Sequence, residues 1–596
     1  MNSKRKILLV YPQIPSNTYW SFKYALRFIN KKTSMPPLGL ITVAALLPDG
    51  YDLRLVDMNV EPLRETDVKW ADLVFVSAMI VQQESFMDVV SMCNKVCRPV
   101  VAGGAYATSS HEEIDGVDYF VLGEAEETLA DFLADFEAGK ARRIYRAETR
   151  PDITNSVVPR FDLLKRDLYA SMAVQYSRGC PFKCEFCDIW TVYGNRPRVK
   201  SAESIIAELD ALRRLGWKDA VFMVDDNFIG NKVKVKKELL PALIEWQKKH
   251  DYLFEFYTEA SINLADDPEL MGLMSEAGFN QVFIGIETPS KEALAETGKS
   301  QNLKHDLMKS VRTIQNHGLE VMAGFIIGFD SDTEDIFDRQ IEFIQEAGIP
   351  KAMVGLLHAL PGTLLYKRLE KEGRLSGHVT GSNTHTMQTN VVTKMDPDTL
   401  REGYKRVLDT IYDKNLKNYF ARCDILLDNL KGTGFKQRKI RLDEIKALLK
   451  SLAFQPPTPY GWQYIKFITR NLFKHPDLFA EVITYSIVGN HFWAITRETL
   501  EAEKVKSKMD EIYQMAMDQL AKYSQTVSGT SAESMKAITR ALNRYKKRLE
   551  NIRRKIDSFH REFAKDLIAR YNEIEDRLGK ILTNITDSSH LAKNGR

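Results

Sequence analysis

The chain has 596 residues, of which 44% are hydrophobic and 27% are charged, and its formal net charge is +3. This composition is typical of a globular protein of about three domains, and so small a charge gives no reason to expect a nucleic-acid partner. Six cysteines do not make a disulfide scaffold in so long a chain, and the lack of an apolar run of about 18 residues predicts no transmembrane span. We therefore expect a cytoplasmic protein with free thiols, whose basic N-terminus begins a strand rather than a signal peptide.

Short apolar runs alternate with helical patterns over residues 1–140. The runs that resemble buried strands are residues 6–12, 52–59, 72–79, 98–104 and 118–123. With helices between them, they predict a doubly wound parallel sheet whose ligands bind at the carboxyl ends of the strands. Residues 141–169 are polar, contain prolines and show little periodicity, so we expect a linker there.

A second alternating series covers residues 170–375. Its expected strands are residues 170–177, 220–226, 254–260, 281–287, 321–329 and 352–360. Six strand–helix units predict a partial (β/α)6 barrel, again of the α/β class, with chemistry at the carboxyl ends of the strands.

Residues 376–596 predict a helical C-terminal region. We interpret it as a solvated helical hairpin or bundle, and the alternative is a basic face directed at a membrane surface or an anionic substrate. The apolar stretch 480–495 is either buried core or a contact for an apolar substrate.

Cys180, Cys184 and Cys187 follow the first strand of the second series with the spacing C-x3-C-x2-C. Zinc sites usually combine such a pair with a second pair or with histidines, and no second pair is present. The triplet suits a [4Fe–4S] cluster in which three irons are held by thiolates and one iron stays open to a small molecule. A zinc knuckle or plainly buried cysteines are the alternatives.

The other three cysteines are Cys93, Cys97 and Cys423. Cys93 and Cys97 lie four residues apart on a predicted helix, so they form a redox pair or, as we prefer, at least one of them is buried against the sheet. Cys423 is interpreted as structural.

The cysteine spacing, with the aromatic Phe186 before the last cysteine, resembles the signature of the radical SAM enzymes. The resemblance implies that S-adenosylmethionine (SAM) chelates the open iron. One electron from the cluster then cleaves the sulfonium carbon–sulfur bond of SAM. The 5′-deoxyadenosyl radical that forms abstracts hydrogen from a substrate. "VDDNF", "GIET" and "GFIIGF" resemble strand ends that contact SAM in that family. The implied SAM-binding residues are Asp225, Asp226, Asn227, Glu287, Gly324 and Gly328.

Two points about this set stay open. The sequence has Asp-Asp-Asn at residues 225–227, where the family more often has Gly-Gly-Glu, so the residue that binds the amino group is not fixed. Glu259, in "TEAS", is a further candidate with an ordinary strand end as the equal alternative.

The N-terminal sheet ahead of such a barrel resembles the cobalamin-binding domain of the methyltransferase branch of the family. The strand-end turns "AGGAYATSS" and "LGEAEET" carry this resemblance, because glycines there allow a close backbone approach to a ligand. The implied cobalamin-binding residues are Ser77, Gly103, Gly104, Thr108, Gly123 and Glu124. The histidine motif D-x-H-x-x-G is absent and the surroundings of His111 do not fit it, so the resemblance implies base-off cobalamin without a histidine ligand. A sheet that binds nothing, or another nucleotide, is the alternative.

The resemblance implies a C-methyltransferase that uses two SAM molecules per turnover, one to methylate cobalamin and one to form the radical that activates an unactivated carbon. It implies an electron donor such as flavodoxin or ferredoxin and a large apolar substrate. We expect a bacteriochlorophyllide side chain, with a hopanoid lipid or a protein side chain as alternatives. A radical SAM oxidative cyclase and a non-enzymatic iron–sulfur redox protein are the alternatives of other classes.

Overall fold

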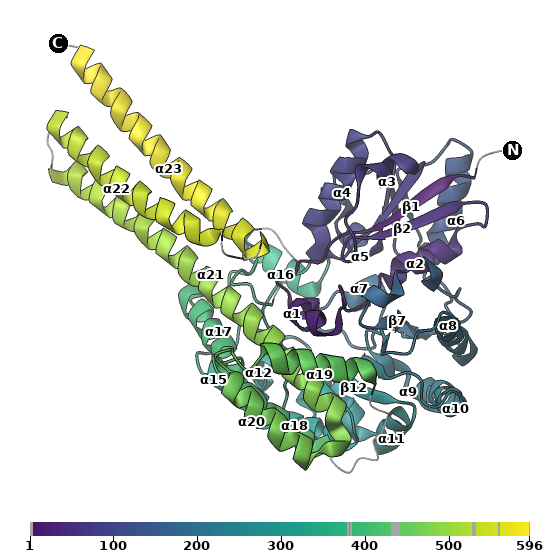
Figure 1. Cartoon of the computed structure of the whole chain (residues 1–596). Helices are drawn as coiled ribbons and strands as arrows, with labels where there is room; N and C mark the ends of the chain where they lie inside the picture. Colours follow the sequence, from purple (N-terminus) through teal and green to yellow (C-terminus); the bar gives the residue numbers. More distant parts are fainter. Residues whose placement is uncertain are drawn as a thin grey trace. The chain divides into compact units, whose positions relative to one another are not determined.

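The computed structural model describes residues 4–377, 381, 384–430, 441–526, 532–557, 559 and 561–594. The described chain forms two six-stranded parallel sheets with helices around them, followed by long C-terminal helices (Figure 1). It divides into two compact units, Met1–Trp493 and Ala494–Arg596.

The first sheet is doubly wound, as the sequence predicts. Its strands are β1 (Lys6–Tyr11), β2 (Asp52–Asp57), β3 (Leu73–Ser77), β4 (Val100–Gly103), β5 (Tyr119–Leu122) and β6 (Ile144–Arg146). They run parallel in the order β2-β1-β3-β4-β5-β6. Helices α3 (Glu65–Trp70), α4 (Gln83–Lys95) and α5 (Gly104–Ser110) share one apolar core with the sheet, and α2 (Leu38–Leu46) and α6 (Ala125–Glu137) share another. Cys93 of α4 is buried in the first of these cores.

The prediction of a linker over residues 141–169 is wrong for residues 144–146, which form a strand. Ile144–Arg146 pairs with β5 as the sixth strand, and the Tyr145 side chain is buried in the core that contains α6. The Tyr145 hydroxyl also donates a hydrogen bond to Asp135 of that helix, at 2.9 Å. Three residues are too few to show the alternation that identifies a strand in a sequence, and the stretch is rich in charge.

The second sheet is an open barrel of six parallel strands. They are β7 (Met172–Val174), β10 (Val221–Met223), β11 (Phe256–Ala260), β12 (Phe279–Glu287), β13 (Glu320–Ile327) and β14 (Ala352–Leu356). The order β14-β13-β12-β11-β10-β7 follows the chain, so each crossover adds the next strand at one edge. The short pair β8 (Ser177–Arg178) and β9 (Arg198–Val199) brackets the three cysteines. This is the predicted partial (β/α)6 barrel.

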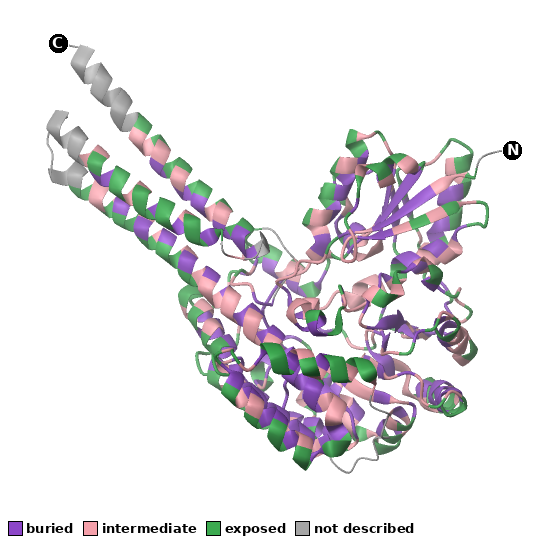
Figure 2. Cartoon of the chain, viewed as in Figure 1, coloured by how far each residue is buried: buried purple, intermediate pink, exposed green. Residues whose placement is uncertain are grey.

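The helices that follow the barrel do not form a single solvated bundle. Helices α17 (Pro397–Ile411), α18 (Lys417–Leu430) and α20 (Gly461–Lys474) contain both buried and exposed residues (Figure 2). Their buried Tyr404, Phe420 and Phe467 belong to the same core as the barrel. The apolar stretch 480–495 lies in α21 (Phe479–Thr526), where Val482, Tyr485 and Phe492 are part of that core. These residues thus serve the core, which was one of the two alternatives.

The second unit contains the rest of α21 together with α22 (Ala532–Ile556) and α23 (Arg561–Asn594). Its buried side chains recur along the helices, and they include Met509, Leu549 and Ile574. Arg570 of α23 donates two hydrogen bonds to Asp510 of α21 at 2.6 and 2.8 Å. Among the described helices, none is both long and apolar enough to cross a bilayer.

An arm from the N-terminal domain, residues 18–30, packs between the barrel and α21. The Tyr19 ring stacks on Phe492 at a centroid distance of 4.9 Å, and Trp20 contacts Phe283 of β12 at 5.3 Å. His491 lies beside the Tyr19 carbonyl, with 3.4 Å between Nε2 and the oxygen. The first and last parts of this unit are therefore joined in its core.

Helices α15 (Ile336–Glu346) and α17 meet at Gly403, where there is no room for a side chain. A Cβ atom at Gly403 would lie 2.1 Å from the ring of the buried Phe337. We expect Gly403→Ala to force the helices apart and to destabilise the protein by about 1–3 kcal/mol, the usual cost of overpacking. Thermal unfolding followed by circular dichroism measures the change.

Gly272→Ala is the matched control, because Gly272 is exposed on α11 (Pro268–Glu276) and no atom lies within 4 Å of its Cβ position. The control should gain about 0.5–1 kcal/mol, because alanine favours helix more than glycine does. A Gly403→Ala protein that unfolds at the wild-type temperature would show that these helices separate easily.

Candidate active site

The cysteine loop is held at the carboxyl end of the barrel by two aspartates that follow β10. Asp225 accepts hydrogen bonds from the Tyr176 and Ser177 backbone amides at 2.7 and 3.0 Å, and from the Ser177 hydroxyl at 2.8 Å. Asp226 accepts from the Gly179 amide at 3.0 Å. Gly179 has φ +93°, and a Cβ there would lie 2.7 Å from the Gly194 carbonyl oxygen, so only glycine fits immediately before the first cysteine.

The hydrogen bonds of Asp225 differ from the role that the sequence suggested for it. Both of its oxygens accept from the loop that leads to the cysteines, and burial raises its pKa to about 7. The side chain therefore orders the loop. The groups that donate to Asp225 belong to Tyr176 and Ser177, nearly 50 residues earlier in the chain, and no sequence pattern predicts this pairing.

The surroundings of the three thiols suit a negatively charged metal cluster. Asn227 donates from Nδ2 to the Cys180 sulfur at 3.9 Å, and Gln301 donates from Nε2 to the Cys184 sulfur at 3.7 Å. Burial raises the pKa of Cys180 and of Cys187, so their thiolates need a positive partner such as iron.

Lys299 supplies a permanent positive charge beside these thiols. Burial opposes its charge, but Glu287 and the thiols of Cys184 and Cys187 outweigh burial and raise its pKa. Its Nζ lies 2.5 Å from Glu287 Oε1, and Glu287 itself has φ +64° at a register shift between β12 and β13. The predicted Glu287 therefore lies next to the cysteine loop through Lys299, which sequence reasoning missed.

In the described part of the chain, no three His, Cys, Asp or Glu side chains are placed to hold one metal ion. A cubane does not need such convergence, because each thiolate binds a different iron. The donor set of three thiols with N–H donors and a lysine beside them therefore fits a [4Fe–4S] cluster.

A second group of side chains at the same strand ends is acidic. Burial raises the pKa of Asp226 to about 6, and burial together with the neighbouring carboxylates of Asp226 and Asp225 raises the pKa of Glu259 of β11 to about 8. Carboxyl groups in this condition are stabilised in their charged form by a cation. They suit the ammonium or sulfonium group of SAM, and Glu259, which the sequence left undecided, belongs to this group.

The remaining SAM-binding candidates are strand-end glycines. Gly324 of β13 packs against Phe283, whose ring would lie 3.0 Å from an added Cβ. Gly328 has φ +109°, and its amide donates to Asp332 at 2.9 Å. Backbone contact of these two glycines with SAM stays a prediction, and the Gly328 amide already donates to Asp332.

The cobalamin-binding candidates gather at the carboxyl ends of β3, β4 and β5. A Cβ at Gly104, which has φ +82°, would lie 2.4 Å from the Ser77 hydroxyl. The Gly123 amide donates to the Thr108 hydroxyl at 3.0 Å, and the space at the Gly123 Cβ position is open to 4 Å. These turns form a cradle of backbone and small hydroxyl groups, which fits a large ligand that lies against the sheet.

Glu124 joins the two sheets through two arginines. Its Oε2 accepts from Arg178 at 2.7 Å and from Arg198 at 3.0 Å, and its Oε1 accepts from Arg198 at 2.7 Å. Arg178 also donates to Glu126 at 2.8 Å. The Arg178 side chain is only 10% exposed, and although burial opposes its charge, the two carboxylates raise its pKa. We call these four residues the interdomain clamp.

The clamp fixes the geometry between the two candidate binding regions. Glu124 directly follows Gly123 at the end of β5, and Arg178 lies two residues before Cys180. The carboxyl edge of the first sheet is thereby held beside the carboxyl edge of the barrel. Sequence reasoning missed both arginines, because their partners lie more than 50 residues away along the chain.

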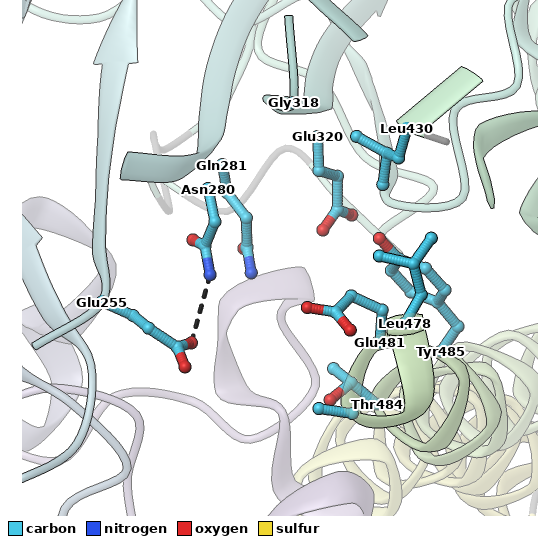
Figure 3. Close-up of a pocket in the computed structure, with 11 residues that line it drawn as sticks. Glu255, Asn280, Gln281, Gly318, Glu320, Leu430, Leu478, Glu481, Thr484 and Tyr485 are labelled. Carbon is cyan, nitrogen blue, oxygen red and sulfur yellow. Dashed lines mark hydrogen bonds between the residues drawn. The ribbon is translucent and has the colours of Figure 1, made fainter. Parts of the chain in front are cut away.

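Two hollows adjoin the barrel. One of about 370 Å³ lies beside the cysteine loop and is lined by Phe182, Asn227 and Ser261, among others. A smaller one of about 50 Å³ lies at the opposite, amino ends of β11–β13, where Glu255, Gln281, Glu320 and Glu481 point toward a common space (Figure 3). Because it is at the other end of the strands, the smaller hollow is separate from the candidate active site.

Comparison with known families gives three matches along the chain. Residues 26–133 match the B12 binding domain, residues 174–359 match the radical SAM superfamily, and residues 363–504 match a domain of unknown function, DUF4070. Together they account for most of the chain through the first half of α21.

Several relatives are named as methyltransferases or methylases. An uncharacterized methyltransferase of Synechocystis sp. is 39% identical over 89% of this chain and 99% of its own length. The hopanoid C-2 methylase of Rhodopseudomonas palustris is 38% identical over 63% of this chain and 71% of its own length. The bacteriochlorophyllide d C-12(1)-methyltransferase of Chlorobaculum tepidum is 24% identical over 62% and 80%.

Among solved structures, the cobalamin-dependent S-adenosylmethionine radical enzyme OxsB, with aqua-cobalamin and SAM bound, shares the fold. The TM-score is 0.54 at 16% identity, over 91% of this chain and 83% of that chain. At this identity the likeness concerns the arrangement of sheets and helices.

The hydrogen bond from Gln301 to the Cys184 sulfur gives a prediction about redox potential. N–H donors stabilise the more negative, reduced form of an iron–sulfur cluster and so raise its potential. We expect Gln301→Leu, after anaerobic reconstitution with iron and sulfide, to shift the cluster potential to a more negative value without loss of iron. Potentiometric titration followed by electron paramagnetic resonance, without SAM, measures it.

Gln281→Leu is the control for this prediction, because Gln281 lines the small hollow at the other end of β12. Its cluster potential should equal that of the wild type. Equal potentials in all three proteins would mean that Gln301 does not influence the cluster.

The raised pKa of Glu259 predicts a pH-dependent stability. The folded state keeps a proton on Glu259 up to about pH 8, whereas the unfolded chain releases it near the ordinary glutamate pKa of 4.5, so stability falls as pH rises through this window. Glu259→Gln removes the effect. In the apoprotein, the variant should therefore gain more thermal stability over the wild type at about pH 8 than at about pH 5.

The exposed Glu203 of α8 (Ala202–Arg214) gives the matched control, Glu203→Gln. It should change the unfolding temperature by the same small amount at both pH values. A Glu259→Gln protein that behaves like this control would contradict the burial of an ionisable group at β11.

Proposed function

The chain belongs to the cobalamin-dependent radical SAM methyltransferase family, and we propose that it methylates an unactivated carbon of a large, polycyclic, apolar molecule. The chain is an enzyme of the methyltransferase class. The nature of the substrate and the roles of individual residues are the proposal.

The interdomain clamp is the observation that carries this function. Methyl transfer to a carbon radical requires the methyl donor and the radical source to face the same substrate atom. Glu124 and Arg178 hold the end of β5 beside the start of the cysteine loop, with a distance of 2.7 Å between their charged atoms. A substrate bound between these two edges would be in reach of both cofactors.

When bound, the cluster, SAM and cobalamin supply the radical and the methyl group, and the protein binds and orients them. We assign Cys180, Cys184 and Cys187 to the cluster. Asp226 and Glu259 are assigned to the cationic groups of SAM, and Asn227 orients Cys180 through its N–H···S contact.

On the cobalamin side we assign the backbone of Gly103, Gly104 and Gly123, together with the hydroxyls of Ser77 and Thr108. Both oxygens of Glu124 already accept from arginines, so its contribution is to position the Gly123 turn. His111 lies near Arg146, with 3.5 Å between Nδ1 and the guanidinium nitrogen Nη2. Its place beside an arginine supports base-off cobalamin without a histidine ligand.

Two substrate classes follow from the relatives. The relative named as a hopanoid methylase is 38% identical to this chain, whereas the one named for bacteriochlorophyllide is 24% identical. We therefore favour a hopanoid-like polycyclic lipid over the bacteriochlorophyllide side chain that the sequence analysis expected. Both are large and apolar.

The test is an anaerobic assay of the reconstituted enzyme with SAM, cobalamin and a flavodoxin or chemical reductant. A pentacyclic hopanoid and a bacteriochlorophyllide are offered in parallel, and mass spectrometry searches each for the gain of one methylene unit. We expect methylated hopanoid together with equal amounts of 5′-deoxyadenosine and S-adenosylhomocysteine. Formation of 5′-deoxyadenosine without S-adenosylhomocysteine would indicate a radical reaction that does not methylate, and would contradict the proposal.

Cys184→Ala is the control for the assay. It removes one cluster ligand and should abolish 5′-deoxyadenosine and the methylated substrate, and leave at most one equivalent of S-adenosylhomocysteine per cobalamin. A methylated bacteriochlorophyllide in place of the hopanoid would keep the reaction type and reverse our preference for the substrate.

A further inference from the structure

Helix α16 (Leu364–Lys371), labelled in Figure 1, is the first helix after the barrel. It lies against the cysteine loop, because the Leu365 amide donates to the Glu185 carbonyl at 3.0 Å. Arg368, one turn further along α16, donates to both carboxylate oxygens of Glu185, at 2.7 and 3.2 Å. Glu185 directly follows Cys184 in the sequence. Helix and loop are thus joined next to one of the residues that we assign to the cluster.

Glu185 is also held from its other side. Its amide donates to the carbonyl of Thr297, which follows α12 (Lys291–Glu296), at 2.9 Å. Cys184 is buried, and its carbonyl accepts from the Cys187 amide at 3.2 Å. A displacement of Glu185 would therefore be passed on to both of these cysteines.

Arg368 is itself oriented by Asp330, which lies beyond the end of β13. It donates to Asp330 Oδ2 at 3.1 Å, and Arg374 donates to the same carboxylate at 2.5 and 2.9 Å. The hydrogen bonds from Arg374 and Arg368 lower the pKa of Asp330 to about 2. A single exposed ion pair contributes little free energy, but a two-point arginine–carboxylate pair within a network of charges contributes more. The contact between Arg368 and Glu185 is of this second kind.

The two halves of the cysteine loop are held by different parts of the chain. The start of the loop is held by Asp225 and Asp226, which follow β10. The stretch from Cys184 to Cys187 is held by Arg368, which belongs to the region that matches DUF4070. The barrel sequence alone therefore does not contain all of the contacts that shape this loop.

We propose that Arg368 is a positioning residue for the iron–sulfur cluster, and that this support is one role of the region that matches DUF4070. By fixing Glu185, it keeps the Cys184 and Cys187 thiols in place for the cluster. The proposal rests on the assignment of the three cysteines under the proposed function, but not on methyl transfer or on the substrate. Side chains that orient metal ligands without touching the metal typically change metal affinity about 10–100-fold when they are replaced.

Release of iron from the full-length protein tests the proposal. The protein is reconstituted anaerobically with iron and sulfide, and a ferrous chelator is then added without SAM. We expect Arg368→Met to take up as much iron as the wild type, because all three thiols are present, and then to lose it about tenfold faster. Arg368→Lys keeps the charge but cannot make the two-point contact, so its rate should lie between those of the two.

Arg374→Met is the matched control. Both arginines pair with Asp330 and Glu372, but of these two described side chains Arg368 alone donates to Glu185. The control should lose iron at the wild-type rate. Glu185→Gln and the double variant Arg368→Met, Glu185→Gln complete the set. Because the two residues act through one contact, the double variant should lose iron no faster than the faster single variant.

Three outcomes would overturn the proposal. One is that Arg368→Met loses iron at the wild-type rate. Another is that Arg374→Met loses iron as fast as Arg368→Met, because the effect would then come from a general loosening of the charged network. The third is that the two single effects multiply in the double variant, which would mean that Arg368 and Glu185 act independently. A wild type that takes up no cluster would contradict the assignment of the three cysteines, and with it both the proposed function and this proposal.

Discussion

The architecture of the active site depends on one buried arginine. Arg178 lies between Glu124, which follows β5 of the first sheet, and Glu126 of α6, and it is also part of the strand that leads into the cysteine loop. Removing one partner of a buried ion pair usually costs about 3–5 kcal/mol, because the other charge is left without compensation. The pairing therefore penalises any arrangement in which the two carboxyl edges separate. Two sheets that fold around separate cores are in this way held in one fixed orientation.

The site is electrically divided. The thiols have a lysine and two amide donors beside them, which suits a negatively charged cluster, whereas the neighbouring strand ends of β10 and β11 are acidic. A ligand with a carboxylate at one end and cationic groups along its length would be oriented by this division before any chemistry occurs. Asp225 shapes the cysteine loop through its oxygens, and its carboxylate also adds negative charge beside Glu259. The cysteine loop is thus preorganised by hydrogen bonds between its backbone amides and side chains that lie outside the loop.

The sequence predicts the repeated elements well and the long-range pairings poorly. All five expected strands of the first sheet and all six of the barrel exist, because each contains a run of apolar residues long enough to recognise. The three cysteines and the strand-end glycines are recognisable for a similar reason, since local spacing alone identifies them. Strand β6 is too short to show a pattern. The use of Glu124 and Asp225 as structural anchors depends on partners 54 and 48 residues away, which no local pattern encodes.

The contacts of the N-terminal arm have a consequence for biosynthesis. Tyr19 stacks on Phe492 and its carbonyl lies beside His491, so this aromatic side chain is covered by residues that are made more than 470 positions after it. Contacts between such distant positions carry a large loop-closure entropy and form late. Tyr19 therefore lacks this aromatic cover until the part of α21 around Phe492 has been made.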